Sequence, residues 1–224
     1  MRTVPDPAPD TLARLTSLEG VPSAFAATRD GIDALLRDRG LRRTTPEQTA
    51  DSLLRGAHAS AELSDGSVDA AVRISAELLS LVPVLKRAPL QVLARLDVLA
   101  GGSGRPATPE AAARMGDLAQ TLLAPTTAPA LLVAAVAHAE IATVAPFGTA
   151  DGLVARAVER LLLVARGVDP ASLVVPEAGH LALRAEYESN LRGYATGGRA
   201  GLHAWLLYAA EAQARGAEES PLRG

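Results

Sequence analysis

Apolar residues recur at helical rather than strand spacing along most of this chain. After a Thr-Pro-Glu start signal at 45–47, Leu53, Leu54, Ala57 and Leu63 follow the spacing of one helix face. The same pattern predicts helices over about 22–39, 46–63, 68–85, 89–100, 109–123, 128–143, 151–166, 177–194 and 199–215. No internal repeat interrupts this order. The pattern therefore predicts an all-α fold, a single helical domain of about eight or nine helices.

The two ends of the chain differ from its middle. Three prolines within residues 1–10 predict a flexible N-terminal arm, which we place at 1–20. The helical domain then covers 21–216, and 217–224 is expected to be a C-terminal tail.

Composition narrows the function classes. Aromatic residues make up only 3% of the chain, so the core has to be built from Ala, Leu and Val. The net charge of −3 is spread along the chain without a basic patch, which argues against a nucleic-acid partner. The absence of cysteine excludes disulfides and thiol chemistry. The apolar run 128–136 is too short to span a bilayer, and residues 1–10 do not resemble a signal peptide, so we expect no membrane association and a cytoplasmic protein.

One segment suggests a binding site. In "HAEIATVAPFGTADGLVARAVERL", residues 138–161, a helix is followed by a Pro-Phe break and a small-residue turn that opens a second helix. A helix N-terminus of this kind suits an anion, yet the turn contains no Lys, His or Cys. Taken by itself, Pro146-Phe147 predicts a helix stop with a core aromatic. Likewise, His138 is expected to be a hydrogen-bonded core histidine, Trp205 a packing residue, and Arg156 equally suited to a surface ion pair.

Residues 145–156 resemble the signature of the Fic (Fido) family, His-Pro-Phe-x-Asp-Gly-Asn-Gly-Arg-x-x-Arg. Pro146, Phe147, Gly152 and Arg156 agree, four of the nine specified positions. His138 stands seven residues before the motif, where family members often have a histidine. Upstream, "PLQVLARLDVLAGGSGRPAT" resembles the family's helix leading into a Gly-Arg loop, and "EYESNLRGYATGGRAGLHAWLLYAAEA" resembles its closing helices. The resemblance covers about residues 45–215.

The resemblance implies adenylyl transfer from ATP with magnesium, but this chain departs from the residues that perform it. Ala145 replaces the catalytic histidine, so no group there can accept a proton. Thr149 replaces the acidic metal ligand, and Leu153 replaces the first phosphate-binding arginine. We therefore expect no ordinary adenylyl transfer, no catalytic residue and no metal site. His58, His180 and His203 show no metal-ligand spacing, and Glu177 with His180 is a lone pair.

Asp151 stands where the family's phosphate loop has asparagine. We expect its carboxylate to cap the helix that begins at about Gly152, and so to occupy the anion site with the protein's own charge. The candidate ligand-binding residues are Gly148, Thr149, Asp151, Gly152 and Arg156.

The family also has an inhibitory helix with Ser-x-x-x-Glu-Gly, whose glutamate pairs with the second signature arginine. "AHASAELSDG" resembles this region, with Ser60 at the serine position and Ser64 and Asp65 at the Glu-Gly positions. Asp65 or Glu62 could pair with Arg156. A second placement, at "LTSLEG", offers Glu19-Gly20 but has Leu15 at the serine position.

Three hypotheses follow. The leading one is a Fic-fold pseudoenzyme, a non-catalytic binding or regulatory module that recognises a protein or peptide above the 144–152 loop, with Arg156 as an anion contact. The alternative is a divergent nucleotide-dependent transferase, moving AMP or a phosphoryl group, that uses Asp151 in place of the lost histidine. The third is a helical structural protein. The sequence leaves open whether a nucleotide binds and whether the chain is a homo-oligomer.

Overall fold

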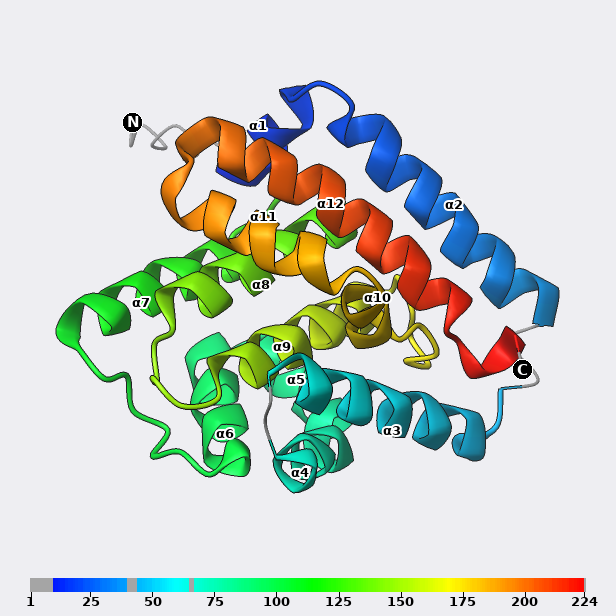
Figure 1. Ribbon diagram of the computed structural model, residues 1–224, viewed down its shortest axis with the longest axis horizontal. Helices are drawn as coiled ribbons and strands as arrows, with labels where there is room; N and C mark the ends of the chain where they lie inside the picture. Colours follow the sequence, from blue (N-terminus) through cyan, green and yellow to red (C-terminus); the bar gives the residue numbers. More distant parts are fainter. Residues whose placement is uncertain (1–9, 40–43, 65–66, 224) are drawn as a thin grey trace, which may run out of the picture.

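The computed structural model describes residues 10–39, 44–64 and 67–223. Within these ranges the chain forms α-helices joined by loops and 3-10 turns and has no β-strand, which confirms the all-α class (Figure 1). The α-helices are α1 (Thr11–Arg14), α2 (Val21–Arg39), α3 (Pro46–Leu63), α4 (Val68–Leu78), α5 (Val82–Leu85), α6 (Pro89–Ala100), α7 (Pro109–Leu123), α8 (Ala130–Val144), α9 (Asp151–Ala165), α10 (Pro176–Ala182), α11 (Arg184–Thr196) and α12 (Gly198–Glu218).

The predicted helix starts are built as the sequence indicates. Thr45 accepts a hydrogen bond from the backbone N–H of Gln48, and the Gln48 side chain accepts one from the backbone N–H of Thr45. This reciprocal pair satisfies two of the donors that a helix N-terminus leaves free. Thr108 caps α7 in a similar way, by accepting from the N–H of Ala111.

Two predicted helices are divided. The helix expected over 68–85 ends at Leu78, continues as a 3-10 turn over Leu79–Leu81 and restarts as α5. Pro83 lies in the first turn of α5, because a proline further inside a helix would remove one backbone hydrogen bond and clash with the preceding turn. The helix expected over 177–194 is broken at Leu183, whose backbone (φ −116°, ψ 39°) leaves the helical region.

Both expected tails are partly packed. Residues 10–20, which we expected in a flexible arm, form α1 and a 3-10 turn, and Leu12 and Leu18 are buried. Near the other end α12 runs to Glu218, and Leu222 is buried in a further 3-10 turn. Asp10 explains the first case, since it caps α1 and also accepts hydrogen bonds from the 126–127 turn.

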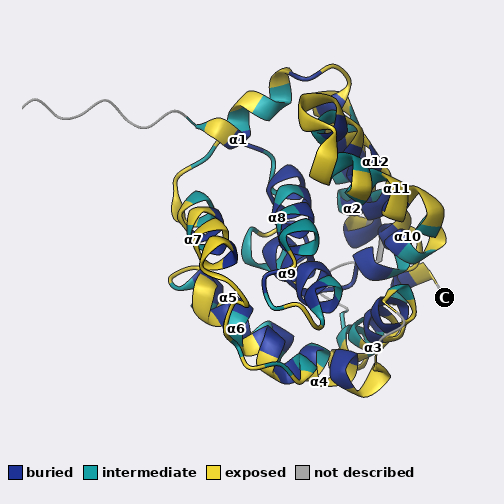
Figure 2. Ribbon diagram, turned by 60° about the vertical axis from the view of Figure 1, so that its left-hand side comes forward, coloured by how far each residue is buried: buried dark blue, intermediate teal, exposed yellow. Residues whose placement is uncertain are grey.

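Helices α8 and α9 occupy the middle of the molecule and the other helices surround them (Figure 2). Residues on every side of α8 are buried, as expected for a helix that is apolar all round. Helix α9 is just as enclosed, although it carries Arg156, Glu159 and Arg160. The centre of this fold therefore contains charged groups that need partners.

Small residues let the outer helices approach closely. A Cβ at Gly179 in α10 would lie 1.9 Å from the carbonyl oxygen of Ala212 in α12. A Cβ at Gly201 in α12 would lie 1.9 Å from the carbonyl oxygen of Gly193 in α11. With so few aromatic side chains, the core reaches its packing density through such backbone approaches and through alanine.

Candidate functional site

The loop 145–150 reverses the chain between α8 and α9. Ala145 closes α8 with a left-handed backbone (φ 46°), and its N–H donates to the carbonyl of Ile141 at 3.0 Å. A positive φ is costly for a residue with a Cβ, so packing must hold it. Pro146 then prevents the helix from continuing, and Gly148 makes a second positive φ of 74°. The predicted helix stop at Pro146-Phe147 is confirmed.

Asp151 does not have the role that we expected. Helix α9 begins at Asp151 itself, and no side chain caps it. The Asp151 carboxylate instead accepts hydrogen bonds from the backbone N–H groups of Phe147 and Gly148, both at 2.8 Å. Only 7% of this residue is exposed. The helix-cap prediction is wrong because the loop folds back over the helix start, but a carboxylate does occupy a pair of converging amides.

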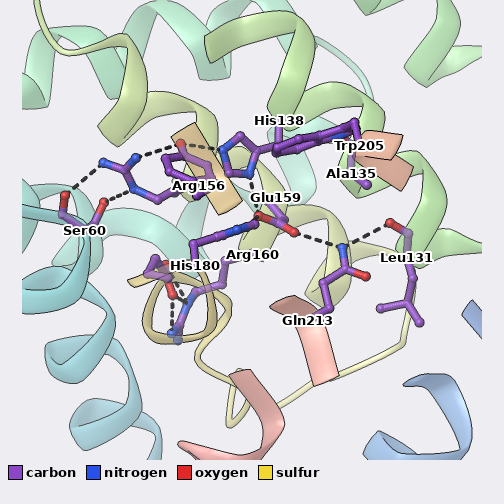
Figure 3. Close-up of polar contacts among 12 residues, drawn as sticks. Ser60, Leu131, Ala135, His138, Arg156, Glu159, Arg160, His180, Trp205 and Gln213 are labelled. Atoms are coloured by element: carbon purple, nitrogen blue, oxygen red, sulfur yellow. Dashed lines mark hydrogen bonds and ion pairs between the residues drawn. The ribbon is translucent and has the colours of Figure 1, made fainter. Parts of the chain in front are cut away.

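Arg156 is buried and fully engaged rather than being a surface residue. Its Nε donates to the Ser60 hydroxyl at 2.8 Å, and Nη2 donates to the Ser60 carbonyl at 2.8 Å (Figure 3). Nη2 also donates to the Ser64 hydroxyl, and Nη1 donates to the Tyr187 hydroxyl at 3.0 Å. Two serines of α3, Ser60 and Ser64, therefore contact this arginine. Arg156 has no hydrogen bond to Glu62, and Asp65 lies outside the described residues.

Gly152 allows α3 to approach α9 at this point. A Cβ on Gly152 would lie 3.0 Å from the Ser64 hydroxyl and 3.2 Å from Nη1 of Arg156. The candidate residues Gly148 and Thr149 are exposed on the outer side of the same loop. The structure therefore divides the predicted ligand-binding set between an exposed loop and a buried arginine.

A second loop, 101–108, lies against loop 145–150. The N–H of Ala107 donates to the carbonyl of Pro146 at 2.7 Å. Asp97, which is 1% exposed, accepts from the N–H of Gly104 at 2.8 Å and from the Thr149 hydroxyl at 3.3 Å. One buried carboxylate thereby fixes both loops, while residues 105–108 remain exposed.

Glu159 is the centre of a polar network inside the fold (Figure 3). One carboxylate oxygen accepts from Nδ1 of His138 at 2.6 Å and from Nε2 of His180 at 2.8 Å. The other accepts from the side-chain amide of Gln213 at 2.8 Å. These four residues have no exposed surface. The prediction of His138 as a hydrogen-bonded core histidine is confirmed.

The donors and acceptors of this network match when both histidines are neutral. Arg156 donates to the Tyr187 oxygen, so the Tyr187 O–H is free to donate to Nε2 of His138 at 3.0 Å. This assignment leaves the Nδ1 proton of His138 for Glu159. In the same way, the Tyr208 O–H donates a hydrogen bond to Nδ1 of His180 at 2.8 Å. The guanidinium and the carboxylate are then the two charges of the chain of hydrogen bonds.

Burial and the hydrogen bonds set the protonation states. Burial lowers the pKa of His138 from 6.5 to about 4, against the opposing attraction of Glu159. Burial alone would raise the pKa of Glu159, but the adjacent His180 and His138, which both donate to it, hold this pKa well below its usual 4.5. Burial also raises the pKa of Tyr187 and of Tyr208. At neutral pH the network therefore contains the Glu159 carboxylate, a neutral His138 imidazole and intact phenols.

His138, Glu159 and His180 also have the side chains that a metal site requires. Ligand atoms of His138, Glu159 and His180 all lie within 4.8 Å of one another. Two imidazoles and a carboxylate would suit zinc or iron. However, both histidines bond the same carboxylate oxygen, and a divalent ion would leave its second charge beside Arg156 without a counter-charge. The imidazole N–H protons of His138 and His180 therefore match the Glu159 carboxylate better than a divalent cation would.

A second buried ion pair joins α9 to α10 and α3. Arg160 makes a bidentate contact with Glu177, with Nε and Nη2 at 3.0 and 2.8 Å from its oxygens. Its Nη1 donates to the hydroxyls of Ser52 and Ser172. A Cβ at Gly56 would lie 2.6 Å from Nη2 of Arg160, so a larger residue would displace this contact.

Sequence reasoning missed most of this interior. A surface ion pair was one of two interpretations of Arg156, and the sequence assigned no role to Glu159 or Arg160, although each of the three is at most 2% exposed. One signal was available, because Leu, Val and Ala flank all three on every face of the helix. Glu177 does not pair with His180 but with Arg160. The confirmed packing residue Trp205 donates from its indole N–H to the Ala135 carbonyl at 2.9 Å.

In the part of the chain that the structure describes, no helix combines the length and apolar character needed to cross a membrane. No protein-family model matches the chain, and no curated protein matches it.

Proposed function

We propose that this chain is a Fic-type domain that has lost transfer chemistry and acts as a protein- or peptide-binding module. The binding surface is formed by the loops 101–108 and 145–150. The observation that carries the proposal is the Asp151 carboxylate, which holds the two loop amides that an anionic ligand would need. A nucleotide phosphate would have to displace a covalently attached and largely buried charge.

The position of α3 supports the same conclusion. Resemblance to the family assigns Ser64 the place of an inhibitory glutamate, and Ser64 does contact Arg156. Here the contact is between a serine and an arginine whose other donors bond Ser60 and Tyr187. With Ala145 at the position of the general base, nothing remains for this contact to inhibit. It serves as a structural link between α3 and α9.

The surface formed by the two loops suits a polypeptide ligand. Residues 105–108 are exposed, and a backbone hydrogen bond from Ala107 to Pro146 fixes them in place. A preformed loop loses little conformational entropy on binding. Arg105 adds one exposed cation, which favours a ligand with an acidic residue.

Selection from a displayed random-peptide library would test the proposal. Selected peptides should lose affinity for Thr149→Trp, which crowds the loop, and for Arg105→Glu, which reverses its charge. Thr196→Trp and Arg87→Glu are matched controls, because these residues are exposed and belong to neither loop. Peptides that bind the loop variants as tightly as the wild type would refute the proposed surface.

The divergent transferase keeps a separate test. Asp151 would have to act as a base or metal ligand, although both of its oxygens already accept hydrogen bonds. Our proposal predicts no heat of binding and no thermal shift with ATP, with or without magnesium. Transfer of a labelled AMP or phosphoryl group by the wild type, abolished by Asp151→Ala, would establish the enzyme instead.

A further inference from the structure

A pocket of about 310 Å³ lies between α2 and the start of α8. Phe25, Leu131 and Val168, each nearly fully buried, belong to its lining. Its remaining walls include the small side chains Ala26 and Ala130. Its volume lies at the lower end of the range, roughly 300–1,000 Å³, that is typical of small-molecule sites.

Two side chains of the lining are polar: Thr16, whose hydroxyl donates to the Ala13 carbonyl at 2.6 Å, and Arg29, the charged donor. Arg29 lines the pocket, and only its Nε is engaged within the described residues, with Asp33 at 2.9 Å. The two Nη groups of Arg29 remain for a ligand. Helix α8 starts in the same wall, and Pro129 at its N-cap position offers no side-chain acceptor. The first backbone N–H groups of α8 therefore add donors and the positive end of the helix dipole.

Nearby acidic groups do not cancel this donor character. Asp33 is partly exposed and shares the guanidinium of Arg29 through one atom only. Asp10 beside the 126–127 turn accepts hydrogen bonds from Ala13, Thr126 and Thr127. Asp169 follows the lining residue Val168, and its carboxylate accepts from the N–H of Val174. Burial raises the pKa of Asp169, and its second oxygen, Oδ1, is buried without a hydrogen-bond partner among the described residues.

We propose that this pocket binds a small carboxylic acid with an apolar body, such as a medium-chain fatty acid. The hydrocarbon covers Phe25, Leu131 and Val168, and the carboxylate faces Arg29 and the start of α8. The site is independent of the loop surface proposed above, because none of its lining residues belongs to the loops 101–108 and 145–150. The ligand class follows from the pairing of apolar walls with unsatisfied donors.

Isothermal titration of the full chain with octanoate, octanol and butyrate tests this site. Octanoate should bind saturably with a Kd below about 1 mM. Octanol lacks the charge and butyrate lacks the apolar length, so each should bind at least about tenfold more weakly, a difference of ~1.4 kcal/mol.

Two variants with matched controls place the ligand. Ala26→Phe fills the pocket and Arg29→Gln removes the charge, and each should raise the octanoate Kd about tenfold or more. Ala27→Phe and Arg37→Gln alter exposed residues of the same helix outside the lining and should leave it unchanged. Absence of octanoate binding, equal affinity for octanol, or an unchanged Kd in Ala26→Phe would each overturn the proposal.

Discussion

Replacing Glu159 by glutamine removes the one carboxylate that the two central histidines share. A glutamine oxygen can still accept from both imidazoles, but its NH₂ group then faces the amide NH₂ of Gln213, which leaves a buried donor without an acceptor. The charge of Arg156 also loses the only carboxylate in its hydrogen-bonded chain. An unsatisfied buried group costs roughly 1–3 kcal/mol, and breaking a buried charge arrangement costs roughly 3–5 kcal/mol.

We therefore expect Glu159→Gln to reduce the free energy of unfolding by about 4 kcal/mol. For a chain of this size that corresponds to a Tm lower by about 8–16 °C. Urea unfolding followed by circular dichroism measures this difference. The control is Glu211→Gln on the exposed side of α12, which should change stability by less than about 0.5 kcal/mol. A loss below about 1 kcal/mol for Glu159→Gln would show that the network is not the electrostatic centre described here.

Three further outcomes follow from the same interior. Because the pKa of His138 is lowered in the folded chain, the unfolded chain binds one more proton between pH 6.5 and about 4, and the free energy of unfolding should fall by on the order of 3 kcal/mol over this range. Urea unfolding at a series of pH values measures this loss, and a free energy of unfolding that stays constant between these pH values would contradict it. Gly179→Ala should prevent the close approach of α10 to α12 and abolish cooperative thermal unfolding, while Gly116→Ala, with open space at its Cβ, should raise stability by about 0.5–1 kcal/mol; equal Tm values for the two would refute the packing argument. Arg160→Met should cost about 3–5 kcal/mol in urea unfolding, since its carboxylate partner stays buried without a cation, and a neutral result would mean that water reaches this pair.

Helical spacing and start signals were enough to predict most of the fold. The start signal at Thr45 is confirmed, and Thr108 caps α7 with the same Thr-Pro-Glu sequence, because capping depends on residues within one turn. The breaks at 79–81 and at Leu183 escaped the pattern, since the apolar spacing continues across both. The packing of residues 10–20 depends on contacts between Asp10 and residues 126–127, which sequence spacing alone cannot reveal.

The candidate site was predictable only where it depends on local order. The turn at 145–152 follows from the local sequence, whereas Ser60 and Ser64 were indicated only by the family resemblance. Both serines contact Arg156 of α9 across more than 90 positions of the chain. The hydrogen-bond partners of the Asp151 carboxylate could not be predicted. An aspartate at a helix start can accept either from the first N–H groups of the helix or from the N–H groups of the preceding loop, and here it accepts from the loop. Glu159 joins two histidines that each lie 21 positions away, so no motif spacing indicates the group.

Trp205 gives this interior its own optical signal. It is the only tryptophan of the chain, and its ring centre lies 5.3 Å from that of His138 and 6.3 Å from that of His180. An indole with no exposed surface should emit at short wavelength, and its emission should shift to the red on unfolding without interference from a second tryptophan. Because an imidazolium quenches indole fluorescence more strongly than a neutral imidazole, the emission intensity of the folded protein should fall when His138 becomes protonated. One steady-state spectrum thus separates acid titration of the core from loss of the fold.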